Sequence, residues 1–145
     1  MRAILGIVIG LIAGAIAAII VGIVAVGATF SLPPGTDPGN MDMLVRTMMA
    51  MPQATRIALA FAWFAGGFGG AAVAKLIARK AWAAWVVALI VAAYFGLNGL
   101  ALTLPLWGTL LWIAAPLLGG LLANRLVGGA PAVVTTEAEA PPANP

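Results

Sequence analysis

The sequence predicts an all-α membrane protein: a four-transmembrane-helix bundle with a short amphipathic helix in an outer loop and a disordered C-terminal tail. Of the 145 residues, 63% are hydrophobic and 8% are charged, whereas a soluble domain has about 25% charged residues. The apolar residues also fall into four stretches. Each is long enough to cross a bilayer as a helix, which takes about 20 residues.

The predicted spans cover approximately residues 3–30, 57–78, 81–97 and 104–123. The first is longer than the usual span of about 17–25 residues, so we expect it to tilt or protrude. It is also too long for the apolar region of a signal peptide, which has about 7–15 residues. We therefore interpret it as an uncleaved span, and residues 1–127 as one transmembrane domain.

The connection at 31–55 begins with Pro and Gly residues that favour turns. From Met41 to Met51, apolar residues recur at helical spacing, which predicts a short amphipathic helix on the outer membrane surface. Methionine thioethers are soft ligands for copper(I), but the helical pattern accounts for most of these methionines, so we predict no metal site.

Residues 128–145 are rich in Ala and Pro, which predicts a disordered cytoplasmic tail.

The positions of the charges predict the orientation. Five cations fall on one side of a four-span topology: Arg2, Lys75, Arg79, Lys80 and Arg125. Arg46 and Arg56 fall on the other side, together with Asp37 and Asp42. Because cytoplasmic loops carry an excess of Lys and Arg, both termini are predicted to be cytoplasmic.

The second span contains an unusual density of glycine in the segment FAWFAGGFGGAAVAK at 61–75. At about 100° per residue, its small residues gather on one face of the helix. Phe61, Phe64, Phe68 and Lys75 lie on the opposite face, where we expect the phenylalanines to meet lipid and Lys75 to reach the headgroups. Small residues spaced four apart let two helix backbones approach closely within a membrane.

The first span offers a matching face, because glycine repeats there every four residues, and the fourth span carries a sparser version. The predicted helix-packing residues are Gly6, Gly10, Gly14, Ala62, Gly66, Gly69, Gly70 and Gly119. Three interpretations remain open from the sequence: packing within one bundle, an interface between copies, or a glycine-lined pore or hinge.

The chain offers little reactive chemistry. It has no Cys and no His, Ser31 is its one serine, and the predicted spans contain no Asp or Glu. No familiar nucleophile–base pair can be assembled from these residues, so we predict no catalytic residue, no cofactor and no enzyme.

The net charge of +3 is small and spread out, which does not indicate nucleic-acid binding. Polar residues within or beside the last two spans are expected to bond between helices or to cap their ends, with a polar path for a solute as the alternative: Asn98, Thr103, Thr109 and Asn124.

Three segments resemble those of an uncharacterised family of small four-span bacterial inner-membrane proteins: LPPGTDPGNMDML, MPQATRIALAFAWFAGGFGGAAVAKLIARK and PLWGTLLWIAAPLLGGLLANRL. The resemblance covers most of the chain before the tail. It implies four spans in a bacterial inner (cytoplasmic) membrane and supplies no activity. Relatives often carry an acidic residue and a histidine near the end of the first span, where this chain reads VGIVAVGATF.

These observations predict a non-catalytic accessory or structural component that acts through glycine-mediated helix packing. The alternative is a small oligomeric channel or transporter for an unidentified solute. The expected partners are the lipid bilayer and a second copy or another membrane protein.

Overall fold

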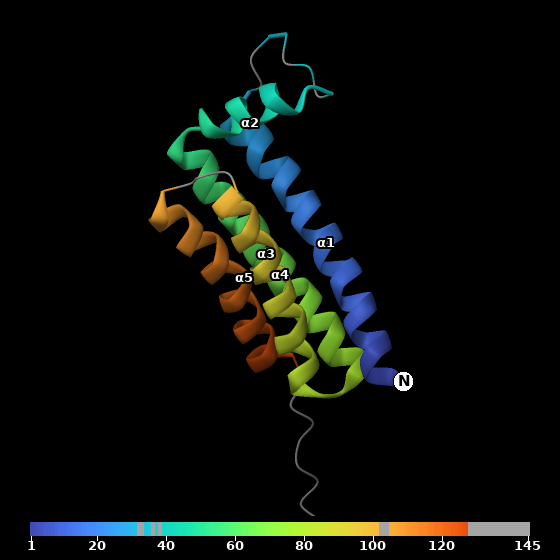
Figure 1. The fold of residues 1–145 in the computed structure, drawn as a ribbon. Helices are drawn as coiled ribbons and strands as arrows, with labels where there is room; N and C mark the ends of the chain where they lie inside the picture. Colours follow the sequence, from blue (N-terminus) through green and yellow to red (C-terminus); the bar gives the residue numbers. More distant parts are fainter. Residues whose placement is uncertain (32–33, 36, 38, 102–104, 128–145) are drawn as a thin grey trace, which may run out of the picture.

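Five helices make up the part of the chain that the computed structural model describes, which is residues 1–31, 34–35, 37, 39–101 and 105–127. They are α1 (Arg2–Thr29), α2 (Met41–Met49), α3 (Gln53–Ala78), α4 (Ala81–Ala101) and α5 (Leu106–Leu126) (Figure 1). All but α2 are long and apolar enough to cross a membrane. The protein is therefore a multi-pass membrane protein, and the predicted all-α four-helix bundle is confirmed.

The helix bounds differ from the prediction mainly at the polar ends. α3 begins at Gln53 rather than near 57, and α4 continues to Ala101 rather than ending near 97. Hydropathy marks only the apolar part of a helix, whereas α3 starts directly after Pro52, a residue suited to the start of a helix. The short helix α2 ends at Met49, two residues before the predicted end. The predicted tail at 128–145 lies outside the described residues.

The central helix of the bundle is α3, which packs against α1, α4 and α5. α1 lies along one flank, packs mainly on α3 and touches α4 only lightly (Figure 1). We call the end that carries α2 the loop end, and the opposite end, where the N-terminus lies, the terminal end. Because the long helices alternate in direction, α3 and α5 both begin at the loop end and both finish at the terminal end.

Two hydrogen bonds join the helices at the loop end. The hydroxyl of the fully buried Thr55 donates to the carbonyl of Thr29, 3.3 Å away, at the end of α1. The carbonyls of the last turn of a helix have no partner within that helix, so Thr55 supplies one from α3. Nη2 of Arg56 donates to the carbonyl of Met49 at 2.7 Å, which fastens the end of α2 to the first turn of α3.

Candidate functional site

Glycines bring the backbones of α1 and α3 into direct contact. Gly6, Gly10 and Gly14 are buried on α1 and face α3. A β-carbon added to Gly10 would lie 2.7 Å from the carbonyl oxygen of Gly70, and one added to Gly14 would lie 2.7 Å from that of Gly66. These separations leave no room for a methyl group. The predicted glycine faces of the first two spans therefore meet each other within one chain.

Two other predicted packing residues lie at the margin of this contact. Ala62 is fully buried, and its Cβ would be 3.7 Å from a β-carbon added to Gly22 of α1. Gly69 is only half-buried, and a β-carbon there would meet Ala17 at 3.4 Å, an ordinary van der Waals distance. Gly69 thus belongs to the same region without requiring the close approach that Gly66 and Gly70 require.

A second close contact joins α3 to α5. A β-carbon on the predicted residue Gly119 would overlap the carbonyl oxygen of Phe64, and one on Gly67 would overlap the backbone of Pro116. Gly67 was not among the predicted packing residues, because the helical wheel assigned a single contact face to this helix. The structure places partners on several sides of α3.

The contact with α5 also corrects the expectation for the aromatic face of α3. Phe61 is 65% exposed, as expected for a side chain that meets lipid. Phe64 and Phe68 are instead partly buried against α5, with their rings stacked on each other at a centroid separation of 6.4 Å. The expectation that these two side chains face lipid is therefore wrong, because α5 occupies that side of the helix.

Lys75 binds within the bundle at the terminal end. Its Nζ donates a hydrogen bond to the carbonyl of Asn124, in the last turn of α5. A cation is favourable at the carbonyl end of a helix, where the peptide dipoles point negative ends outward. We expected Lys75 to extend freely to the headgroups, but the structure gives it an internal acceptor. The amide oxygen Oδ1 of Asn124 is buried without a hydrogen-bond partner.

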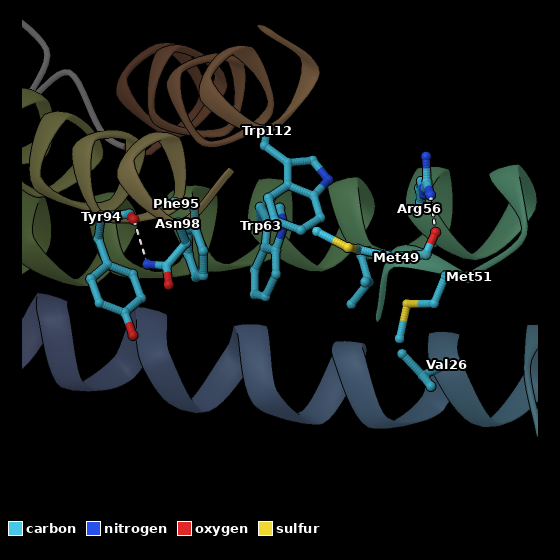
Figure 2. Close-up of a pocket in the computed structure, with 10 residues that line it drawn as sticks. Val26, Met49, Met51, Arg56, Trp63, Tyr94, Phe95, Asn98 and Trp112 are labelled. Carbon is cyan, nitrogen blue, oxygen red and sulfur yellow. Dashed lines mark hydrogen bonds between the residues drawn. The ribbon is translucent and has the colours of Figure 1, made fainter. Parts of the chain in front are cut away.

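A cavity of about 400 Å³ opens near the loop end, between α1 and the other helices (Figure 2). Its volume lies within the range of about 300–1,000 Å³ that is typical of small-molecule sites. Every helix contributes a side chain, from Val26 on α1 to Trp112 on α5, and the lining is almost entirely apolar. This cavity combines the volume of a small-molecule site with side chains from every helix of the described structure and is therefore the candidate site.

Aromatic rings from three helices form one wall of this cavity (Figure 2). Trp63 of α3 stacks on Phe95 of α4 with ring centroids 3.7 Å apart and planes 22° from parallel. Trp112 of α5 meets Trp63 edge-on at 5.8 Å. Such pairs contribute about 0.5–1.5 kcal/mol each beyond the area that they bury, so this wall is firmly held.

Polar atoms beside the cavity lack partners. Nε of Arg56 and Nε1 of Trp63 are both buried, and neither N–H donates to an acceptor within the described structure. By contrast, Nδ2 of Asn98 donates to the carbonyl of Tyr94, one turn earlier in its own helix, at 2.7 Å. The cavity therefore combines apolar walls with two N–H donors that have no acceptor among the residues that the structure describes.

The other polar residues singled out in the sequence do not gather at the cavity. Thr109 is buried on α5, Asn124 lies at the terminal end, and Thr103 is outside the described residues. Over the described positions, no group of three or more His, Cys, Asp or Glu residues could hold a metal ion. Of the loop methionines, Met43 accepts a weak hydrogen bond at its Sδ from the amide of Asp37 at 3.2 Å.

Sequence reasoning missed the cavity because its lining residues come from separate segments with no shared motif. Neither Trp63 nor Tyr94 was among the predicted site residues. The one available indication was that Trp63, Phe95 and Trp112 each lie towards the loop end of their spans. Comparisons of the chain with protein-family models, curated proteins and solved structures find no match.

The contact between α1 and α3 predicts a large difference between two Gly→Ala substitutions in α1. Gly10→Ala should destabilise the bundle by about 1–3 kcal/mol, because its methyl group would meet the backbone of α3. Gly27→Ala should be neutral or slightly stabilising, since a β-carbon there has no neighbour within 4 Å. The free energy of unfolding in mixed detergent micelles measures both. Equal stabilities for the two variants would contradict the proposed contact.

The contact between α3 and α5 is tested by two glycines on the same helix. Gly67→Ala should lower the thermal unfolding midpoint and change the tryptophan emission, because it pushes Pro116 and the neighbouring Trp112 away from Trp63. Gly69→Ala is the control and should change neither quantity appreciably. A larger effect at Gly69 than at Gly67 would mean that α5 does not pack as described.

Proposed function

We propose that this protein is a non-catalytic accessory or structural component of a membrane that acts through its packed helices. The observation that supports this most is the use of glycine on both sides of α3. Gly66 and Gly70 meet α1 while Gly67 meets α5, which joins three spans through backbone contacts. Close contacts of this kind favour a firmly packed bundle, as a structural component requires.

The inventory of reactive groups supports a non-catalytic role. The chain has no Cys or His, and the four long helices of the described residues contain no Asp or Glu. Proton- and cation-coupled transporters usually carry an acidic group within the membrane for coupling. The composition therefore favours packing over chemistry as the basis of function.

The proposed location is the inner (cytoplasmic) membrane of a bacterium, with both termini in the cytoplasm. The topology brings Arg2, Lys75, Arg79, Lys80 and Arg125 to the terminal end. The positive-inside rule would place that end in the cytoplasm. The resemblance to the uncharacterised family of small four-span inner-membrane proteins supports the same location, and membership of that family is part of the proposal.

The bilayer is the first proposed partner. Ten large aliphatic side chains of α1, between Ile4 and Val24, are 37–69% exposed in the isolated chain. Because the glycine faces are used within the bundle, association with a second copy or another membrane protein would use other surfaces. Nucleic acid is not among the proposed partners, since the net charge is small.

The alternative, a small channel or transporter, is less well supported. A solute path would have to continue from the cavity to the terminal end. In that half of the bundle, Ala74, Ala83 and Val87 are fully buried and pack into one cluster with Ala78. This packing of small apolar side chains favours a closed interior.

Single cysteines can test the orientation because the chain has none of its own. Pro34→Cys and Ala81→Cys each place a thiol at an exposed position, the first at the loop end and the second at the terminal end. A membrane-impermeant maleimide should label Cys at position 34 in intact spheroplasts, and Cys at position 81 only after permeabilisation. The reverse pattern would overturn the proposed orientation.

The structural role predicts a defined assembly. The tagged chain can be extracted in mild detergent and its photobleaching steps counted. The count should give a constant number of copies per particle, or a constant ratio of copies to one other membrane protein. Gly66→Leu should disrupt the bundle, and with it that assembly, because a β-carbon at Gly66 would already lie 2.9 Å from Cβ of Ala18, whereas the control Gly27→Leu should not. In parallel, liposomes containing the protein should show no tracer flux.

Two results would contradict this proposal. One is a solitary chain with no stable partner. The other is solute flux that Asn98→Ala abolishes, which would favour the channel or transporter instead.

A further inference from the structure

We propose that the cavity at the loop end is a lipid-binding site that takes one acyl chain of an anionic phospholipid, with the lipid phosphate held by Arg56. This goes beyond the structural role, because it assigns a ligand class to a site that helix packing does not require. Four features of the structure carry the inference: the lining, the lateral entrance, the unpartnered donors and the charge.

The lining matches a hydrocarbon chain. Leu59, Trp63, Phe95 and Trp112 present apolar or aromatic surface to the cavity, and Met51 adds a flexible thioether (Figure 2). Met is suited to irregular apolar shapes because its side chain has three rotatable bonds. A water-soluble ligand would gain little from such walls, whereas an acyl chain exchanges one apolar environment for another and fills space that would otherwise be empty.

The entrance faces the membrane. A groove of about 210 Å³ runs between α1 and α4, lined by Gly14 and Ala18 on one side and Ile90 and Val91 on the other. Tyr94 and Phe95 line both the groove and the cavity, so the two spaces are adjacent. Since α1 touches α4 only lightly, a chain from the surrounding leaflet can enter sideways between them.

The unpartnered donors need acceptors that the described part of the chain does not supply. Arg56 already uses Nη2 on the carbonyl of Met49, while its Nε is buried and unpaired. A guanidinium has five N–H donors arranged to bind phosphate through two parallel bonds. Trp63 lies two helical turns, about 10 Å, further into the membrane, and its free Nε1–H suits a deeper acceptor such as an ester carbonyl.

The charge at this end of the cavity favours an anion. Arg56 is the one charged residue among those that line the cavity within the described structure. It lies in the first turn of α3, which contains no acidic residue. The N-terminus of a helix carries a partial positive charge. This charge and the positive charge of the guanidinium both attract an anion at the same place. A lipid with net negative charge is therefore preferred over a zwitterionic lipid with the same chains.

The experiment is native mass spectrometry of the full-length protein, incubated in detergent with equimolar phosphatidylglycerol and phosphatidylcholine of identical acyl chains. We expect one phosphatidylglycerol to remain bound after detergent removal. Arg56→Gln should reduce its retention about tenfold or more, since charge-assisted bonds are lost. Arg46→Gln is the matched control, because Arg46 lies at the same end but does not line the cavity.

Two further variants separate binding from folding. Arg56→Lys keeps the positive charge and should keep most of the preference for phosphatidylglycerol. Trp63→Phe keeps an aromatic ring against Phe95 but removes the N–H, and should weaken retention, whereas Trp107→Phe, at an exposed position on α5, should not. Equal retention of the two lipids, or unchanged retention in Arg56→Gln, would overturn the proposal and leave only bulk lipid in the cavity.

Discussion

The whole bundle depends on the absence of β-carbons along α3. Within a bilayer, lipid tails are as apolar as the helices, so helices associate through packing contacts rather than through exclusion of water. Gly66 and Gly70 let α3 touch the backbone of α1, and Gly67 lets it touch the backbone of α5. α4 closes a third side with Ala83 and Ala84, which pack against Ala71, Ala74 and Ala78 of α3. The helix that carries four glycines between residues 66 and 70 is thus the one that holds the others together.

The same contacts determine where the cavity lies. Along α1, added β-carbons would meet α3 at 2.7 Å from Gly10 and from Gly14, and at 3.7 Å from Gly22. The backbone contact therefore loosens from Gly14 towards Gly22, while Thr55 still donates to the carbonyl of Thr29 at the end of α1. Large aromatic side chains line the space beside this looser part of the interface, but they do not fill it. The site lies where close backbone contacts give way to contacts between side chains.

Much of this architecture can be predicted from the sequence, for a physical reason. Spans are encoded locally, as runs of apolar residues, and a glycine repeat such as that of Gly6, Gly10 and Gly14 is visible without knowing its partner. What cannot be predicted is how many partners a helix has. Phe64 was expected to meet lipid, and Gly67 was left out of the predicted packing residues, because the wheel of α3 was interpreted with one neighbour. The cavity was hidden for the same reason, since it is made by residues that become neighbours only when all the helices are in place.

The attachment of α1 mainly to one helix has a consequence for biosynthesis. α1 leaves the ribosome before α3, which follows only after the intervening loop and α2 have been made. α1 has a mean hydropathy of 3.0 over its most apolar window, against 1.7 for α3, so it is suited to residing in the membrane alone. α3, with its glycines, inserts less readily by itself. α1 is thus expected to be in the membrane before α3 and to provide the surface against which the glycine-rich α3 packs.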